Sequence, residues 1–334
     1  MGGSRMIDYT VVSSRVRLAR NFADMRFPSR ASLSDADKVE KAVVSAGKEL
    51  FDASFYRMSE LAEQEKSYLV ERRLISPALT ESPYGGALIR RDKSLSVMTM
   101  EEDHVRAQSF TSGLDLESCF QKVKEFDLSL RSKARLAFDK SLGYLTACPT
   151  NVGTGMRASV MLFLPALTSL GKIGELEEEL KSASLTLRGA LGEGTKAEGY
   201  FYQISNGISL GVSEETILNR VSSAAERIRS IEKDLLSAYY RRETIALEDA
   251  IYRAFAILTS ARVLSEKELE SLIVNVKIGV SLGLIELNDV NLDDLALMCK
   301  PLSLVRLTGC GDSPAERDVT RADTVRKILK GKEG

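Results

Sequence analysis

Two arginines stand two residues apart near the N-terminus, in the stretch SSRVR that contains Arg15 and Arg17. Residues at positions i and i+2 of a β-strand project from the same face, so a strand here would present both guanidinium groups together. Each planar group can donate two parallel hydrogen bonds to phosphate oxygens. The pair predicts a phosphate-binding strand face, and the alternative is an ordinary solvated face.

Acidic residues gather further along the chain, in MEEDHVR (100–106), where Glu101, Glu102 and Asp103 precede His104 and Arg106. Adjacent carboxylates repel one another. Such a cluster is tolerated on a solvated turn and is useful at a site that binds a cation. The residues alone leave both interpretations open.

Two glycine-containing turns carry further reactive side chains. ACPTNVGTGMRASV holds Cys148 at the end of an expected strand and Arg157 at the start of an expected helix, and RGALGEG holds Arg188 and Glu193. A cysteine in such a place is more often a plain buried thiol. Each of these features therefore has a structural explanation as well as a functional one.

Several well-known sites are excluded by what the sequence lacks. It contains no Gly-x-x-x-x-Gly-Lys-Ser/Thr loop, no His-Arg-Asp or Asp-Phe-Gly motif and no Gly-x-Ser-x-Gly motif. A single histidine rules out sites that need two, and the four cysteines include no Cys-x-x-Cys pair, so we expect neither a zinc site nor a disulfide scaffold. A phosphate-handling enzyme with this sequence would have to hold the phosphate charge with arginine.

Composition narrows the class of protein. The 334 residues include 46 basic and 47 acidic side chains, no Trp and only 6% aromatic residues, which argues against nucleic-acid binding. The longest apolar run, near residues 159–167, is too short to span a bilayer, and the N-terminus lacks a signal-peptide pattern. We therefore expect a cytoplasmic protein that binds neither nucleic acid nor membrane.

Strands and helices are mixed in the first two thirds of the chain, and helices dominate after it. Residues 34–72 read as a long helix, 85–100 as a hairpin of two strands, 119–138 as an amphipathic helix, 143–148 as a short buried strand and 156–170 as a helix. Strands around 185–190 and 201–210 precede helical pattern from Ser213 onward. Because strands and helices do not alternate regularly, we predict an α+β fold, an antiparallel sheet flanked by helices, in 1–243, and a small all-α domain in 244–334.

The C-terminal part holds a third arginine motif, RDVTRA (317–322). Ser313 and Pro314 predict a helix start, which puts Arg317 and Arg321 four residues apart on one helix face with Asp318 alongside. Two guanidinium forks with a carboxylate could hold a group that bears both phosphate and guanidinium. The alternative is an exposed, salt-bridged helix. A small helical module of this kind often supplies the interface of a two-fold homodimer.

Five motifs together resemble the phosphagen (guanidino) kinase family, in this order along the chain: SSRVRLARN, MEEDHVRAQ, GYLTACPTNVGTGMRASV, LRGALGEGTKAEG and YQISNGISLG. The resemblance implies transfer of the γ-phosphoryl group of Mg-ATP to a guanidinium nitrogen. A protonated guanidinium is a poor nucleophile, so a carboxylate must orient it and accept its proton. By the resemblance Glu102 is that carboxylate, Glu193 is a second clamp, and Cys148 helps to place the guanidinium.

The same resemblance assigns the nucleotide site. The residues implied to surround the triphosphate or lie in the nucleotide pocket are Arg15, Arg17, Arg106, Arg157, Arg188 and His104. Magnesium keeps most of its waters and bridges phosphate oxygens, so no protein metal cluster is expected. The sequence departs from the family pattern at Met100, where Asn is usual, at Arg73, where His is common, and at Lys196, where an acidic residue is common.

Within the family, the chain most resembles the bacterial protein-arginine kinases. SSRVRLARN begins at Ser13, which leaves no room for the N-terminal helical domain with which relatives enclose a free amino acid, and RDVTRA matches a motif of that branch. The resemblance implies phosphorylation of exposed arginines in proteins, in stress response and protein quality control, with an activator protein and a Clp-type unfoldase or protease as partners, and allosteric phosphoarginine binding at Arg317, Asp318 and Arg321. The alternatives are a kinase for a free guanidino compound and a non-catalytic phosphoarginine-binding scaffold.

Overall fold

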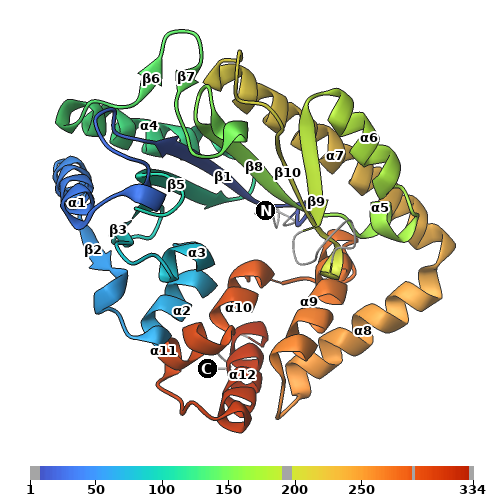
Figure 1. Cartoon of the computed structure of the whole chain (residues 1–334). Helices are drawn as coiled ribbons and strands as arrows, with labels where there is room; N and C mark the ends of the chain where they lie inside the picture. Colours follow the sequence, from blue (N-terminus) through green and yellow to red (C-terminus); the bar gives the residue numbers. More distant parts are fainter. Residues whose placement is uncertain (1–7, 190–197, 288–289, 331–334) are drawn as a thin grey trace.

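The computed structural model describes residues 8–189, 198–287 and 290–330. An eight-stranded sheet forms its centre, with helices packed around it and a group of helices at the C-terminal end (Figure 1). Every neighbouring pair of strands in the large sheet is antiparallel. The predicted fold class, an antiparallel sheet flanked by helices and followed by helices, is confirmed.

The strands do not follow one another across the sheet in chain order, which is β2-β3-β4-β5-β1-β8-β10-β9. β1 lies near the middle and pairs with β5 on one side and β8 on the other. The strands are β1 Val11–Arg20, β2 Ala53–Arg57, β3 Gly86–Arg90, β4 Leu95–Thr99, β5 Val105–Ser112, β8 Met156–Phe163, β9 Leu185–Gly189 and β10 Phe201–Asn206, and β6 Phe138–Asp139 with β7 Gly143–Tyr144 forms a separate small hairpin.

The helices differ in length and in what they cover. Three long ones, α1, α4 and α7, pack on one face of the sheet and enclose the main hydrophobic core with β-strand residues such as Val16, Leu18 and Val160. The α-helices are α1 Leu33–Lys48, α2 Glu63–Glu71, α3 Pro77–Thr80, α4 Leu116–Lys133, α5 Pro165–Ser169, α6 Ile173–Ser182, α7 Glu214–Arg242, α8 Thr244–Ser260, α9 Glu266–Ser281, α10 Leu292–Met298, α11 Pro301–Thr308 and α12 Pro314–Leu329.

Two of the predicted helices are wrong. The expected helix over 34–72 divides into α1 and α2, because the residues between them form β2, which pairs with β3 more than thirty positions later. The expected helix over 156–170 is strand β8 followed by the short helix α5. In both cases pairing with a strand distant in sequence overrides a local pattern that favoured helix.

The expected strand over 143–148 shrinks to Gly143–Tyr144, and the residues after it form a loop that carries Cys148. The predicted hairpin over 85–100 is confirmed as β3 and β4, and the capping residues Ser265 and Ser313 open α9 and α12 as expected. α7 ends at Arg242 and α8 begins at Thr244.

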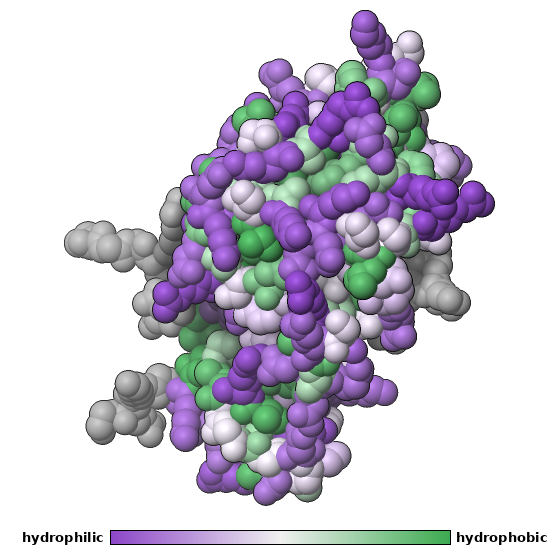
Figure 2. All heavy atoms as spheres, turned by 60° about the vertical axis from the view of Figure 1, so that its left-hand side comes forward, coloured by the Kyte–Doolittle hydropathy of each residue, from purple (hydrophilic) through white to green (hydrophobic). Residues whose placement is uncertain are grey.

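The C-terminal helices surround a hydrophobic cluster of their own. Tyr9, which precedes β1, and Phe163 of β8 join this cluster, and α11 lies against α2, so the C-terminal helices are packed onto the rest of the chain. The face that includes the β2 edge is mainly hydrophilic, with smaller hydrophobic patches between the charged side chains (Figure 2). Within the described ranges, no helix has the length and apolar character needed to cross a membrane.

Candidate active site

Strand β1 turns its two faces toward different surroundings. Val16 and Leu18 are buried in the core beneath the helices, whereas Arg15 and Arg17 project from the opposite side. Cross-strand neighbours in an antiparallel sheet share a face. Arg17 stands opposite Arg157 of β8, which confirms the strand geometry expected for SSRVR and corrects the expectation that Arg157 opens a helix.

The register brings arginines from four strands together. Ala19 stands opposite Arg106 of β5, and Gln203 of β10 stands opposite Arg188 of β9. We call this side of the sheet the arginine face, and its members are Arg15, Arg17, Arg106, Arg157 and Arg188. It holds the five arginines that the sequence motifs singled out, although they lie up to 173 positions apart.

On the arginine face, several guanidinium donors have no acceptor among the described residues. The Nε atoms of Arg15, Arg17, Arg106 and Arg157 are buried without a hydrogen-bond partner among the described residues. Burial and the neighbouring arginines lower the pKa of Arg15 to about 10 and that of Arg17 well below its usual value. Buried donors without acceptors are costly. Such a surface is built to receive a group with several negative oxygens.

The arginines that do have partners are held by polar residues that the sequence analysis did not single out. Gln108, two positions after Arg106 on the same strand face, accepts a hydrogen bond from Arg15 and donates through Nε2 to the carbonyl of Leu74 at 2.8 Å. Ser205 accepts from Arg157 Nη2 at 3.0 Å. Side chains two positions apart on a strand share a face, so the spacing of Gln108 from Arg106 could have identified it from the sequence.

The acidic motif forms the turn between β4 and β5. Met100 has a φ of 57°, and its N–H donates to the carbonyl of His104 at 3.0 Å, which closes the turn. Asn tolerates this left-handed conformation better than Met does, which explains why Asn is usual at this position in the family that the sequence resembles. Glu101 pairs with Arg106 at 2.8 Å, and its other oxygen accepts from Ser76 at 2.7 Å.

Glu102 is exposed at the tip of this turn. Partial burial and the charges of Asp103 and Glu101 raise its pKa, while Arg106 and Arg17 act in the opposite direction. Both of these arginines belong to the arginine face, and their charges favour the ionised form of Glu102. A carboxylate with a raised pKa is a stronger base, which suits a proton acceptor.

His104 does not reach this surface. Its ring is fully buried, Nδ1 accepts from the Phe22 N–H at 3.0 Å, and Nε2 lies 2.7 Å from the Arg26 carbonyl. An Nδ1 acceptor requires that Nε2 carry the proton and donate it to that carbonyl. Both ring nitrogens thus hold the chain after β1, and the expectation that His104 lies in the nucleotide pocket stays a prediction.

Cys148 is half-buried in the loop before β8. Its Sγ lies 3.0 Å from Thr150 Oγ1. Burial and the charge of Arg188 lower the pKa of Arg157, and Cys148 acts in the opposite direction. Glu193 and Lys196 lie outside the described residues. The strand register thus gathers the five arginines on one side of the sheet. The turn that bears Glu102 leads into β5, which carries Arg106, and the loop that bears Cys148 leads into β8, which carries Arg157.

The C-terminal motif differs from the expected pair of free guanidinium forks. Arg317 and Arg321 do lie on α12, but Arg321 is only 1% exposed. Its Nε donates to the Cys299 carbonyl and its Nη1 to the Leu264 carbonyl, each at 2.9 Å, and it also pairs with Asp318. Arg321 therefore anchors the helix, and Arg317 is the more accessible member of the pair.

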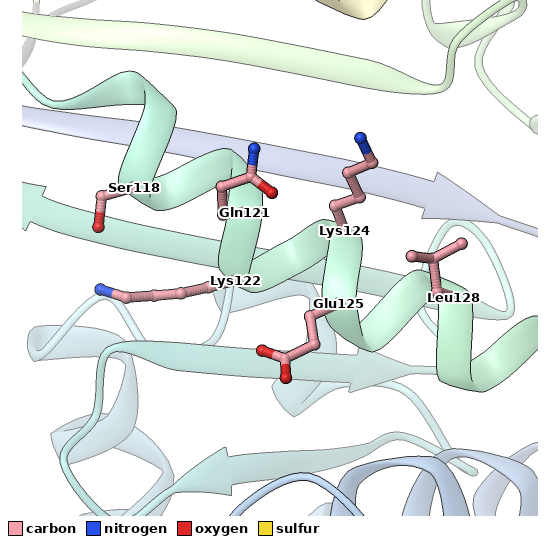
Figure 3. Close-up of a pocket in the computed structure, with 6 residues that line it drawn as sticks. All are labelled: Ser118, Gln121, Lys122, Lys124, Glu125 and Leu128. Atoms are coloured by element: carbon pink, nitrogen blue, oxygen red, sulfur yellow. The ribbon is translucent and has the colours of Figure 1, made fainter.

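A hollow lies over the outer surface of α4, on the side of the sheet away from the arginine face. Figure 3 shows its lining, which comes from one helix: Ser118, Gln121, Lys122, Lys124, Glu125 and Leu128. The mixed charges and single-helix origin give it no convergent chemistry. In the part of the chain that the structure describes, no group of three or more His, Cys, Asp or Glu side chains could hold a metal ion.

Comparison with known proteins defines the class to which this site belongs. The family model of the ATP:guanido phosphotransferase C-terminal catalytic domain matches residues 36–235, and that of the protein-arginine kinase McsB C-terminal domain matches residues 244–334. The fold resembles the crystal structure of lombricine kinase, with a TM-score of 0.62 over 71% of this chain and 70% of that chain at 24% identity. Taurocyamine kinase from Schistosoma mansoni with bound transition state analog components gives 0.62 over 72% of this chain and 35% of that chain at 26% identity.

Relatives match over nearly the whole chain. The protein-arginine kinase of Bacillus subtilis is 39% identical over 329 residues, covering 96% of this chain and 90% of the relative. That of Syntrophomonas wolfei is 40% identical over 333 residues, covering 97% and 93%. This chain belongs to the ATP:guanido phosphotransferase family, and its full-length relatives carry the name protein-arginine kinase.

Proposed function

We propose that this protein transfers the γ-phosphoryl group of ATP to the guanidinium group of arginine residues in proteins. The observation that carries the proposal is the arginine face, where four buried Nε atoms lack partners within the described residues. The names of the full-length relatives support the acceptor.

The residues divide the chemistry between them. Arg15, Arg17, Arg106, Arg157 and Arg188 bind the phosphate oxygens, and their rigid forks fix the γ-phosphorus in line with the acceptor nitrogen. Magnesium, bound through the phosphates and water, would neutralise part of the phosphate charge. The four orphaned Nε donors on this face fit such a polyphosphate.

Glu102 then orients the acceptor guanidinium and accepts its proton. The bond between guanidinium nitrogen and phosphorus forms as the bond between phosphorus and the bridging oxygen breaks, which leaves ADP and a phosphoarginine side chain. Glu193 is proposed as the second carboxylate on the guanidinium. Cys148 helps to place the guanidinium and forms no covalent intermediate.

A direct test is incubation of the protein with Mg-ATP and an unfolded protein substrate, followed by mass spectrometry under conditions that preserve the acid-labile N–P bond. We expect phosphoarginine in the substrate. Free arginine, offered in parallel, should be a much poorer acceptor. A kcat/KM for free arginine equal to or above that for the polypeptide would assign the chain to a metabolite kinase instead.

The C-terminal helices suggest how the enzyme is organised. We propose that residues 244–334 form a separate module that supplies a homodimer interface, because α8 exposes apolar side chains, including Ile245 at 85% and Tyr252 at 48% exposure. Sedimentation of the wild type and of Ile245→Asp tests this. A monomeric wild type would refute it.

Regulation is proposed at the same module. Product phosphoarginine would bind near Arg317 and Asp318 and raise activity through a second site. Because Arg321 anchors α12, Arg317→Ala is the cleaner test, and it should abolish the response while basal catalysis remains.

We further propose a cytoplasmic role in stress response and protein quality control, with an activator protein and a Clp-type unfoldase or protease as partners.

A further inference from the structure

The residue that follows β1 connects three separate segments. Asn21 is 2% exposed, and its Nδ2 donates to Asp103 Oδ1 at 2.6 Å and to the Leu145 carbonyl at 3.1 Å. Its Oδ1 accepts from the His104 N–H at 2.8 Å. Both amide donors and the amide acceptor are thus used, so the side chain has one orientation that satisfies the site.

Asp103 extends this link to the cysteine loop. The same Oδ1 accepts a second hydrogen bond, from the Ala147 N–H, at 2.7 Å, and the side chain is 3% exposed. Asp103 directly follows Glu102, and Ala147 directly precedes Cys148. One buried oxygen atom therefore joins the backbones next to two residues of the proposed active site.

We infer that Asn21 and Asp103 are positioning residues, which hold the turn bearing Glu102 in fixed register with the loop bearing Cys148. The inference rests on the proposed function, since it gives those two residues their roles. Neither Asn21 nor Asp103 touches substrate in this account. Both are buried behind the groups that do.

The origin of the link explains why register matters. Asn21 continues the strand that carries Arg15 and Arg17, so the bridge ties the proposed base and thiol to the same strand that would hold the phosphates. Transfer needs donor and acceptor in line, and a displacement of about 1 Å can lower the rate about 10²-fold. A turn that was attached only at its two ends would not hold Glu102 to within that distance.

The neighbouring residue strengthens the attachment of the same loop. Arg20 donates to the Thr154 carbonyl at 3.0 Å, and its guanidinium lies 3.6 Å from the centre of the Tyr144 ring. Adjacent residues at the end of β1 therefore hold the cysteine loop at two places. Only the Asn21 contact continues through Asp103 to the turn of Glu102.

The test compares Asp103→Ala with Asp103→Asn in the full-length protein. The alanine removes the bridging oxygen, whereas asparagine keeps an Oδ1 that can accept both hydrogen bonds. We expect Asp103→Ala to lower kcat by about 10²-fold with the KM for ATP close to the wild-type value, since the arginine face is untouched, and Asp103→Asn to restore most of kcat. Asp139→Ala is the matched control, because Asp139 accepts from the N–H groups of Ser141 and Leu142 at the exposed tip of the same loop region.

A second readout does not depend on turnover. Alkylation of Cys148, followed by peptide mass spectrometry, should speed up several-fold in Asp103→Ala, while the half-buried Cys310 serves as an internal reference. If Asp103→Ala is too unstable to assay, Asn21→Asp tests the same link, because it keeps the size of the side chain and replaces its donors by acceptors.

The outcomes separate this inference from the proposed function. Wild-type kcat and wild-type Cys148 reactivity in Asp103→Ala, with only a lower melting temperature, would reduce the bridge to fold stabilisation and overturn the inference. Equal loss in Asp103→Asn and Asp103→Ala would also overturn it, since the charge and not the bridge would then matter. Full activity of Glu102→Gln would instead refute the proposed base, whatever Asp103 does.

Discussion

Replacing Arg15 by Met should make the nucleotide-free protein more stable and nearly inactive. In the folded chain the Arg15 guanidinium is buried beside other arginines, and both effects lower its pKa from the ordinary guanidinium value to about 10. At pH 7 it is charged in both the folded and the unfolded state, so the unfavourable burial of that charge is present in full. This unfavourable contribution would disappear only as the pH rises from about 10 toward the ordinary pKa of a guanidinium group.

The size of the effect follows from this shift. About 1.36 kcal/mol per pKa unit gives a ceiling of about 3 kcal/mol. Loss of the hydrogen bond from Arg15 to Gln108 offsets about 1 kcal/mol of this. The Met side chain replaces much of the aliphatic stem, so we expect a net gain of about 1–2 kcal/mol in the free energy of unfolding, or a few degrees in melting temperature.

Thermal unfolding with and without Mg-ATP, together with transfer assays, checks this prediction. Arg15→Met should melt higher than the wild type without nucleotide, lose the stabilisation by Mg-ATP, and lose about 10²-fold or more in activity. Arg20→Met is the control on the other face of β1, where the guanidinium is buried but paired with Asp127 at 2.7 Å. That variant should lose about 1–3 kcal/mol instead, since it removes the Arg20 donors from the buried Asp127 carboxylate, which then keeps only Arg131. A nucleotide-free Arg15→Met that melts lower than the wild type would refute the argument.

The remaining predictions concern the base, the phosphate cage and one buried carboxyl. Glu102→Gln should lower kcat at least about 10²-fold with ATP binding retained, and wild-type kcat should fall in acid at a pH above that of an ordinary Glu, because the pKa of Glu102 is raised and its ionised form is needed. Arg157→Lys should recover little of the activity lost in Arg157→Ala, since lysine lacks the fork, and full recovery would mean that a point charge suffices. Burial raises the pKa of Glu232 from 4.5 to about 7, so its contribution to stability is greatest below pH 4.5 and is lost as the pH rises through about 7. Denaturant unfolding of Glu232→Gln against the wild type should therefore favour the variant increasingly over that range, by at most about 3 kcal/mol, and a pH-independent difference would contradict it.

The sequence by itself determined the features that depend on neighbouring positions. The two-residue spacing of Arg15 and Arg17 put both on one strand face, because side chains alternate along any strand. Ser265 and Ser313 opened helices because each side chain reaches a backbone N–H three residues later. The ordered motifs also indicated the family, which the comparisons confirm.

Only the tertiary structure decided the features that depend on residues far apart in the chain. Residues 156–163 form a strand because β1 and β10 flank them, and that pairing sets Arg157 opposite Arg17. Burial and hydrogen bonding then distinguish candidate site residues that the sequence alone does not tell apart. His104 and Arg321 are enclosed and hydrogen-bonded to backbone carbonyls, whereas Arg17 retains a buried donor without an acceptor in the described chain. Burial and partner geometry arise from contacts across the fold, and no local spacing encodes them.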